Sequence, residues 1–221
     1  MIIAIDGPSA SGKSTTAKGV SEVLSILYID TGAMYRALTY GFIKEMIDLN
    51  NSREIKKYLS NVDVNFNSKN EICLNNRSLS LEIRSKNITS KVSSVSAISS
   101  VRDKMVKLQR KIAEGKSCIL EGRDIGTVVF PHAKYKFFMS AELKDRAERR
   151  MLDYIKNGED ISIDQVKKQI EQRDKFDSTR KNSPLRMSKD AVLIDTSRMS
   201  INEQINKIVD IVVNKQGKLK V

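Results

Sequence analysis

The sequence predicts an α/β fold in which a five-stranded parallel sheet carries two additions, an inserted lobe with a small antiparallel sheet and a helical lid. Two observations predict this fold. Short apolar runs, each closed by a polar residue, alternate with helical segments, which is the pattern of βαβ units with buried strands. One stretch instead alternates apolar and polar residues, as a half-exposed antiparallel sheet does. The expected parallel strands are 1–6, 26–29, 118–120, 137–139 and 191–194.

The expected helices lie between and after these strands. The spacing of apolar residues predicts helices over 13–24, 33–47, 93–114, 142–157, 163–176 and 201–213. Val62, Val64 and Phe66 alternate with polar neighbours, and asparagine-rich turns follow, so residues 62–84 are expected to form an antiparallel meander. These features divide the chain into a core of 1–35, 100–145 and 183–221, an insert of 36–99 and a lid of 146–182.

Composition excludes several classes of protein. With 40% hydrophobic and 30% charged residues, the 221-residue chain is neither disordered nor collagen-like. Two cysteines, Cys73 and Cys118, and one histidine, His132, provide neither a zinc ligand set nor a nucleophilic triad. The N-terminal apolar run is too short for a signal peptide, and no run reaches the ~18 apolar residues of a membrane span. We therefore expect a soluble, cytoplasmic protein that does not bind membranes.

The net charge of +12 indicates nucleic acid, a phosphorylated substrate or a solvated lysine-rich surface, and the surface is the favoured interpretation for the lysines. The segment from Gly7 to Ser14 fits the pattern G-x-x-x-x-G-K-S between a predicted strand and a predicted helix. Backbone amides of such a loop wrap a polyphosphate, Lys13 neutralises its β- and γ-oxygens, and the Ser14 hydroxyl can ligate Mg²⁺. The loop therefore predicts binding of a nucleoside triphosphate.

Two sets of polar residues lie where a solvated surface is not expected. Arg102 is on the apolar stripe of the predicted helix 93–114, where it either snorkels to solvent or points into a cleft at an anion. Arg123 and Asp124 follow the third core strand at its carboxyl end. Ligands of open α/β sheets bind at that edge, although the pair could also form an ordinary ion pair in a loop.

Further arginines lie on predicted helices. Arg173, Asp177 and Arg180 have the i, i+4, i+7 spacing of one helix face, which suits either a solvated salt bridge or a clamp on phosphates. Arg146 and Arg150 are one turn apart just past the fourth strand. Their spacing suits either an exposed charged face or contact with a bound nucleotide.

Several strings of residues together resemble the bacterial cytidylate kinase family. They are IDGPS at 5–9, DTGAMYR at 30–36 and the long, specific EGRDIGTVVFP at 121–131, continued by 146–151, 172–174 and 183–185. The resemblance spans essentially the whole chain. It implies a P-loop kinase core, a monophosphate-binding insert, and Mg²⁺-dependent phosphoryl transfer from ATP to CMP or dCMP.

The resemblance also implies roles for individual residues. ATP is held by the phosphate loop and by two lid arginines, that is, by Gly7, Pro8, Ser9, Ala10, Ser11, Gly12, Lys13, Ser14, Thr15, Arg146 and Arg150. The CMP phosphate and sugar, or the transferring phosphoryl group, contact Thr31, Arg36, Arg123, Arg173 and Asp177, and cytosine is read by Ser93, Arg102, Asp124 and Arg180. Lys13, Arg123, Arg173 and Asp177 form the expected catalytic set. Ser14 is the expected metal ligand, assisted by either Asp30 or Glu121.

Two other functions compete with this interpretation. Kinases of sugars or of shikimate act on acceptors without a phosphate, so several cleft arginines would have no role there, and a dephospho-coenzyme A kinase is separated by a screen of acceptors. A nucleic-acid-dependent ATPase is disfavoured by 5% aromatic residues and the lack of tryptophan. We expect small-molecule partners only, no nucleic acid, and a monomer.

Overall fold

The computed structural model describes residues 1–156 and 158–217. The last residue of the predicted helix 142–157 and the end of the predicted core segment 183–221 therefore lie outside the described residues. The chain forms two compact units. The first comprises 1–29 and 116–221, and the second comprises 30–115.

The first unit contains the predicted five-stranded sheet. Its strand order is β2-β6-β1-β7-β8, and β1 pairs in parallel with both β6 and β7. This order places β1, the strand that leads into the phosphate loop, in the middle of the sheet. The strands are β1 (Ile2–Asp6), β2 (Leu27–Asp30), β6 (Cys118–Gly122), β7 (Tyr135–Ser140) and β8 (Val192–Asp195), all five at the predicted places.

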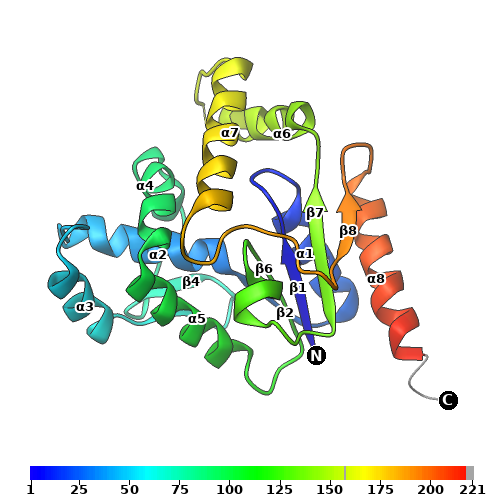
Figure 1. The fold of residues 1–221 in the computed structure, drawn as a ribbon, viewed down its shortest axis with the longest axis horizontal. Helices are drawn as coiled ribbons and strands as arrows, with labels where there is room; N and C mark the ends of the chain where they lie inside the picture. The colour runs from blue at the N-terminus through cyan, green and yellow to red at the C-terminus, as the bar shows by residue number, and fades with distance from the viewer. Residues whose placement is uncertain (157, 218–221) are drawn as a thin grey trace. The chain divides into compact units, whose positions relative to one another are not determined.

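The main core of this unit lies on one face of the sheet. Ile3 and Ile5 of β1 point to that face and pack with Phe137 of β7 and with two helices, α1 (Lys13–Leu24) and α8 (Ile201–Gly217). Figure 1 shows both helices beside the strands. Because side chains alternate along a strand, Ala4 and Asp6 point to the opposite face. There the short π-helical turn η2 (Ile125–Val129) packs against β1.

Two helices, α6 (Leu143–Lys156) and α7 (Ile163–Thr179), pack side by side in the first unit. Ser162 begins α7 with a capping box, in which its side chain and that of Gln165 each satisfy the other's backbone amide. The helices share a small core around Ala147 that also contacts Ala10 of the phosphate loop. This pair occupies the segment predicted to be the lid.

The second unit combines helices with the predicted meander. Its three-stranded sheet has the order β3-β4-β5, with antiparallel pairing throughout. Helix α3 was not predicted, and Asn51 caps its N-terminus through two backbone amides. The elements are α2 (Thr31–Lys44), α3 (Ser52–Asn61), β3 (Val64–Phe66), β4 (Ile72–Leu74), β5 (Arg77–Ser78), η1 (Glu82–Arg84), α4 (Lys86–Ala97) and α5 (Ser99–Ala113).

The prediction of one long helix over 93–114 is wrong. The chain forms α4 and α5 instead, separated at Ile98, whose backbone is extended with φ −69° and ψ 124°. Serines around the break are weak helix formers, which lowers the cost of interrupting the helix. The side chain of Arg102 donates to the carbonyl of Ser96 at 3.2 Å, so the break leaves that carbonyl bonded.

The second unit extends beyond the predicted insert of 36–99 at both ends. Helix α2 packs against α4 and α5, and α5 also packs against α3 and β3, so both helices belong to one compact body with the meander. Among the described residues of the whole chain, no helix is both long and apolar enough to cross a membrane.

Candidate active site

The phosphate loop joins β1 to α1 and depends on two glycines. A Cβ at Gly7 would lie 2.1 Å from the carbonyl oxygen of Met139, so only glycine permits this close approach to β7. Gly12 has a φ of 87° and is the N-cap of α1. Within the described residues no side chain caps this N-terminus. The first-turn amides and the positive end of the helix dipole are therefore available to a phosphate.

Lys13 is buried at the start of α1, with an exposed fraction of 5%. Its Nζ donates to the carbonyl of Pro8 at 2.5 Å and to the hydroxyl of Ser11 at 3.2 Å. Burial and then the nearby Arg123 lower the pKa of Lys13 to about 7. Arg173 acts in the same direction, whereas Glu121 and Asp6 oppose it. A buried ammonium beside two guanidinium groups is destabilised until an anion arrives, so this arrangement favours binding of a polyphosphate.

The next residue, Ser14, contacts a buried carboxylate. Its hydroxyl donates to Oε1 of Glu121 at 2.6 Å, and the Tyr28 hydroxyl donates to the same oxygen at 3.4 Å. Glu121 is 5% exposed and lies on β6, beside the loop. Asp30, the other carboxylate considered from the sequence, is used differently. One of its oxygens caps α2 through the amide of Ala33, and the other pairs with Arg36 at 3.1 Å.

Asp177 holds two arginines. Nε of Arg123 donates to one carboxylate oxygen of Asp177 at 2.9 Å, and Arg180 lies 3.7 Å from the other oxygen. Burial would lower the pKa of Arg123, but the ion pair and hydrogen bond with Asp177, together with Glu121 and Asp174, hold that pKa above its ordinary value. Arg180 is the residue at which α7 ends, so the helix does not run on through it as the i, i+7 spacing assumed. Its contact with Asp177 forms nevertheless.

Asp174 links helices α6 and α7 to the phosphate loop. It accepts a hydrogen bond from the amide of Ser9 at 3.1 Å and pairs with Arg146, which itself donates to the carbonyl of Ser9 at 3.3 Å. Asp174 was not selected from the sequence, although it lies in the string 172–174. Its role depends on a contact between residues far apart in the chain, which sequence spacing does not reveal.

The two arginines that follow on α6 have different surroundings. Arg150, the residue predicted to contact ATP, lies 3.9 Å from Asp153 and stacks over the Tyr154 ring, so its observed contacts stay within its own helix. Arg149 instead donates to the hydroxyl and the carbonyl of Thr196, whose hydroxyl donates in turn to the carbonyl of Ser11 in the loop. Arg149 therefore supports the loop through Thr196, and it was not among the residues predicted from the sequence.

The second unit carries the remaining predicted residues. Thr31 is buried in the first turn of α2, and Arg36 follows one turn later, paired with Asp30. Arg102 is only 4% exposed, and its guanidinium lies 5.5 Å from the centre of the Tyr35 ring, so it does not snorkel to solvent. Ser93 is half-buried on α4. The structure therefore buries Arg102 within the second unit, where its guanidinium contacts Tyr35 and the Ser96 carbonyl.

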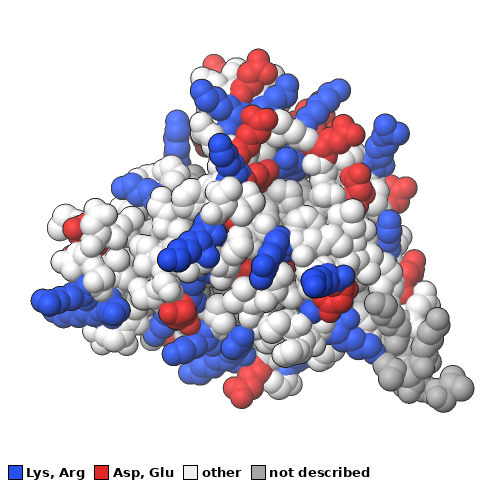
Figure 2. All heavy atoms as spheres, in the orientation of Figure 1, with Lys and Arg blue, Asp and Glu red and all other residues white. Residues whose placement is uncertain are grey.

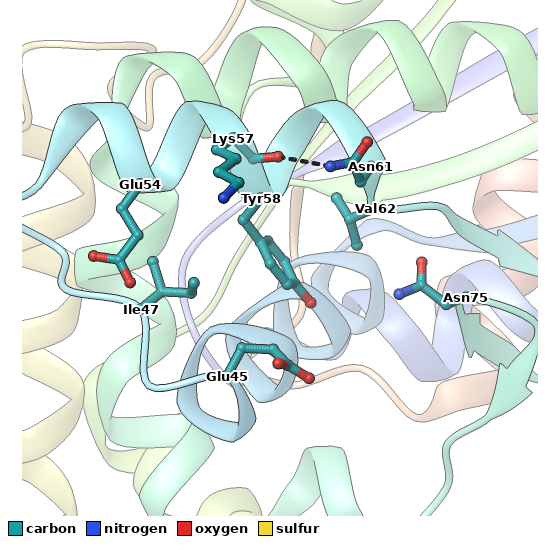
Figure 3. A pocket seen from close by; sticks show the side chains of 8 residues that line it. All are labelled: Glu45, Ile47, Glu54, Lys57, Tyr58, Asn61, Val62 and Asn75. Carbon is teal, nitrogen blue, oxygen red and sulfur yellow. Dashed lines mark hydrogen bonds between the residues drawn. The ribbon is translucent and has the colours of Figure 1, made fainter.

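Two surface features lie outside these groups. Figure 2 shows lysines and arginines dispersed over the visible face, with acidic side chains among them. A hollow of about 310 Å³ in the second unit is lined by residues of α3 and by the ends of α2 and β4. Figure 3 shows the Tyr58 ring projecting into it, with Glu45 and Asn75 around the hydroxyl. None of the residues predicted to bind a substrate lines this hollow.

The parallel sheet and the lysine-bearing phosphate loop at its central strand place this protein in the class of P-loop proteins, which bind nucleoside triphosphates. A shikimate kinase structure from Bacteroides thetaiotaomicron shares the fold with a TM-score of 0.50 at 12% identity, covering 96% of this chain and 98% of that one. The family model for cytidylate kinase matches residues 3–214. The chain belongs to the cytidylate kinase family.

Relatives of high similarity support the same assignment. The chain is 45% identical over 212 residues to a cytidylate kinase of Halalkalibacterium halodurans, covering 95% of this chain and 96% of the relative. It is 44% identical over 208 residues to a cytidylate kinase of Fusobacterium nucleatum, covering 94% and 95%. The similarity therefore extends over nearly the full length of both chains and includes both compact units.

Proposed function

We propose that this protein transfers the γ-phosphoryl group of ATP to CMP or dCMP, giving ADP and CDP or dCDP. The observation that carries the proposal is the buried cluster in the first unit. Lys13 lies at the phosphate loop, and Arg123, held by Asp177, is near enough to lower the pKa of Lys13. Donor and acceptor in this reaction are both phosphates, so a site for it requires several cations close together. Membership of the cytidylate kinase family supports the same substrates.

The residues act by positioning and by charge compensation. Phosphoryl transfer passes through a loose transition state whose charge is spread over the phosphoryl oxygens, and it needs little help from a base. The loop from Gly7 to Thr15 and Lys13 hold the β- and γ-phosphates of ATP. Arg123 and Arg173, with Asp177 orienting the cluster, stabilise the transferring group. Arg146, which already contacts the loop, holds ATP together with Arg150.

Mg²⁺ fits the residues beside the loop. Ser14 and Glu121 offer adjacent hard oxygen donors, which this ion prefers. Within the described part of the chain no group of three or more His, Cys, Asp or Glu side chains is placed to hold a metal, so water and phosphate oxygens must complete the shell. When bound, Mg²⁺ neutralises charge on the phosphates. Since Asp30 is committed to α2 and Arg36, we assign Glu121 rather than Asp30 to ordering the ion.

Replacing Glu121 by glutamine tests this assignment. The neutral amide holds the ion and Ser14 less strongly, so the Mg²⁺ concentration for half-maximal activity should rise about tenfold. ADP release is measured across a Mg²⁺ titration at fixed ATP. Glu22→Gln, an exposed change on α1, is the control and should leave the titration unchanged. If the Mg²⁺ concentration for half-maximal activity were unchanged in Glu121→Gln, the assignment of Glu121 to the metal site would be wrong.

Recognition of cytosine is assigned to Asp124, Arg180, Arg102 and Ser93. Cytosine presents an amine donor at N4 and acceptors at N3 and O2, so it suits a carboxylate facing N4 and cations facing the other two. Uracil presents an acceptor at O4 and would leave the carboxylate unpaired. Asp124 is 4% exposed, so such a mismatch would be desolvated. Thr31, Arg36 and Arg173 are assigned to the CMP phosphate and sugar.

Asp124→Ala should lower kcat/KM for CMP far more than for UMP. A lost bond to a charged group is worth roughly 1.5–3 kcal/mol, about ten- to a hundredfold in kcat/KM. Arg36→Ala, which removes a phosphate contact, is the comparison variant and should lower both substrates about equally. The measurement is kcat/KM for each nucleotide with each variant. Equal losses in Asp124→Ala would assign Asp124 to the phosphate or metal instead of to the base.

The proposed function is tested by ADP release from ATP with CMP, dCMP, UMP and AMP as acceptors. Turnover should be highest with CMP or dCMP, and turnover favouring AMP would overturn the proposal. The assignments of the second unit, 30–115, as the CMP-binding insert and of 146–182 as a lid belong to the same proposal. A monomeric state and a cytoplasmic location stay predictions.

A further inference from the structure

Asp6 is a buried carboxylate that the assignments above leave without a role. It is the last residue of β1 and lies directly before Gly7 of the phosphate loop. Its exposed fraction is 4%. One carboxylate oxygen accepts a hydrogen bond from the amide of Ile125 at 2.7 Å, and the other accepts one from the amide of Gly126, also at 2.7 Å. Both oxygens are thus committed to the turn that follows Arg123 and Asp124.

The sequence directs Asp6 to this turn by strand alternation. Ile3 and Ile5 point into the main core, so Asp6 points to the other face, where η2 packs. The fit at the contact is tight. A Cβ added to Gly126 would lie 3.3 Å from Oδ2 of Asp6 and 3.3 Å from Cδ of Lys136, so a side chain at residue 126 would push these neighbours away by a few tenths of an ångström.

Holding a carboxylate in this buried position has a desolvation cost. Burial and, to a smaller extent, the neighbouring Asp124 raise the pKa of Asp6 to about 6 in spite of the two hydrogen bonds from backbone amides. Lys13 is the cation that acts in the opposite direction. An apolar side chain would avoid this cost, but it could not accept hydrogen bonds from the two backbone amides of the turn.

We propose that Asp6 is a positioning residue that holds the acceptor-binding turn in register with the phosphate loop. The chain continues from Asp6 into the loop that holds ATP, and its carboxylate holds the two residues that follow Arg123 and Asp124. A shift of the turn would therefore move Arg123 and Asp124 relative to Lys13. This inference rests on the proposed function, because it assigns ATP to the loop and CMP to the turn.

The reaction should be sensitive to the position of the turn relative to the phosphate loop. Phosphoryl transfer depends on in-line placement of the two phosphates, and a displacement of about 1 Å can cost on the order of a hundredfold in rate. ATP binding depends on the loop itself and should be less affected. Loss of the Asp6 contacts should thus lower kcat while the KM for ATP stays nearly constant. Because a loss of folded enzyme would also lower the apparent kcat at an unchanged KM, kcat is expressed per folded enzyme, with the folded fraction taken from the circular dichroism of the same samples. A merely structural residue would leave kcat per folded enzyme unchanged.

The test compares Asp6→Asn with Asp6→Ala. Asparagine keeps one acceptor oxygen and alanine keeps none, so kcat should fall about tenfold in Asp6→Asn and about a hundredfold in Asp6→Ala, with the KM for ATP within threefold of the original. Asp190→Asn is the matched control. It breaks the ion pair with Lys136, which lies beside the same turn, but leaves the amides of Ile125 and Gly126 bonded, and kcat should stay within about twofold.

Amide hydrogen exchange gives a readout that does not depend on activity. In the unaltered protein the amides of Ile125 and Gly126 should exchange slowly, and in Asp6→Asn at least one of them should exchange faster. Fast exchange of both in the unaltered protein would overturn the contact even if both variants failed to fold. Turnover of folded Asp6→Ala within threefold of the original would overturn the positioning role.

The two proposals can fail separately. If the unaltered protein does not phosphorylate CMP or dCMP, the proposed function is wrong, whatever the variants do. If it does, and Asp6→Asn raises the KM for ATP as much as it lowers kcat, Asp6 supports the phosphate loop alone and the coupling of the two loops is wrong. A loss confined to kcat with faster exchange at Ile125 or Gly126 is the supporting result.

Discussion

Lys13→Ala should remove nearly all turnover while the protein stays folded. Lys13 donates only to the phosphate loop, through Pro8 and Ser11, and contributes charge rather than apolar packing. In the proposed mechanism its ammonium compensates the charge that develops on the phosphates in the transition state. Loss of such a group costs on the order of 3–5 kcal/mol of barrier, or about three orders of magnitude in kcat.

The measurement is kcat from coupled ADP release, with thermal unfolding recorded on the same samples. The unfolding temperature should not fall, because burial and Arg123 already disfavour the charged lysine. Lys18→Ala is the matched control, since Lys18 is an exposed lysine on the same helix. Its turnover should match that of the original protein. Near-normal turnover of folded Lys13→Ala would show that the assignment of ATP to the phosphate loop is wrong.

Asp177→Ala should reduce both activity and stability. Asp177 is 3% exposed and holds Arg123 and Arg180, so its loss leaves two guanidinium groups in a buried site without their shared carboxylate. Removing one partner from a buried ion pair typically costs about 3–5 kcal/mol of unfolding free energy. Because Arg123 loses its orientation, kcat/KM for CMP should fall by two orders of magnitude or more, on the order of 3 kcal/mol.

Urea unfolding and kcat/KM separate the two effects. Asp164→Asn, an exposed change whose ion pair with Lys167 lies at the start of the same helix, should alter the unfolding free energy by less than about 0.5 kcal/mol. Asp177→Asn keeps the shape of the side chain and should lose activity with a smaller loss of stability. If Asp177→Asn kept both activity and stability, the carboxylate charge would have no role in holding the arginines.

Much of the fold follows from local pattern. The apolar runs at 1–6, 118–120 and 137–139 are buried strands, because a run flanked by helical segments can be satisfied only inside a parallel sheet. The phosphate loop is equally local, since its glycines, Lys13 and Ser14 lie within eight consecutive residues. The alternation at Val62, Val64 and Phe66 indicated the meander for the same reason.

Elements whose limits depend on distant partners were not predictable in this way. The break at Ile98 has no proline or glycine to mark it, and apolar spacing continues through it, so the sequence pattern indicates one helix. The chain separates there because Arg102 bonds the carbonyl of Ser96 and because α4 and α5 both pack against α2. Helix α3 was not predicted, although Asn51 provides a strong N-cap.

The sequence by itself determined the class of fold, the phosphate loop and the arginines that are candidates for phosphate contact, since each of these depends on residues close together in the chain. Only the tertiary structure decided how those charges are paired. Asp6 meets Ile125 and Gly126, Asp174 meets Ser9, and Asp177 meets Arg123. Each pair is joined by the order of strands in the sheet and the placement of α7. Hydrogen bonds and ion pairs act over a few ångströms, so their partners are known only once the fold has brought distant segments together.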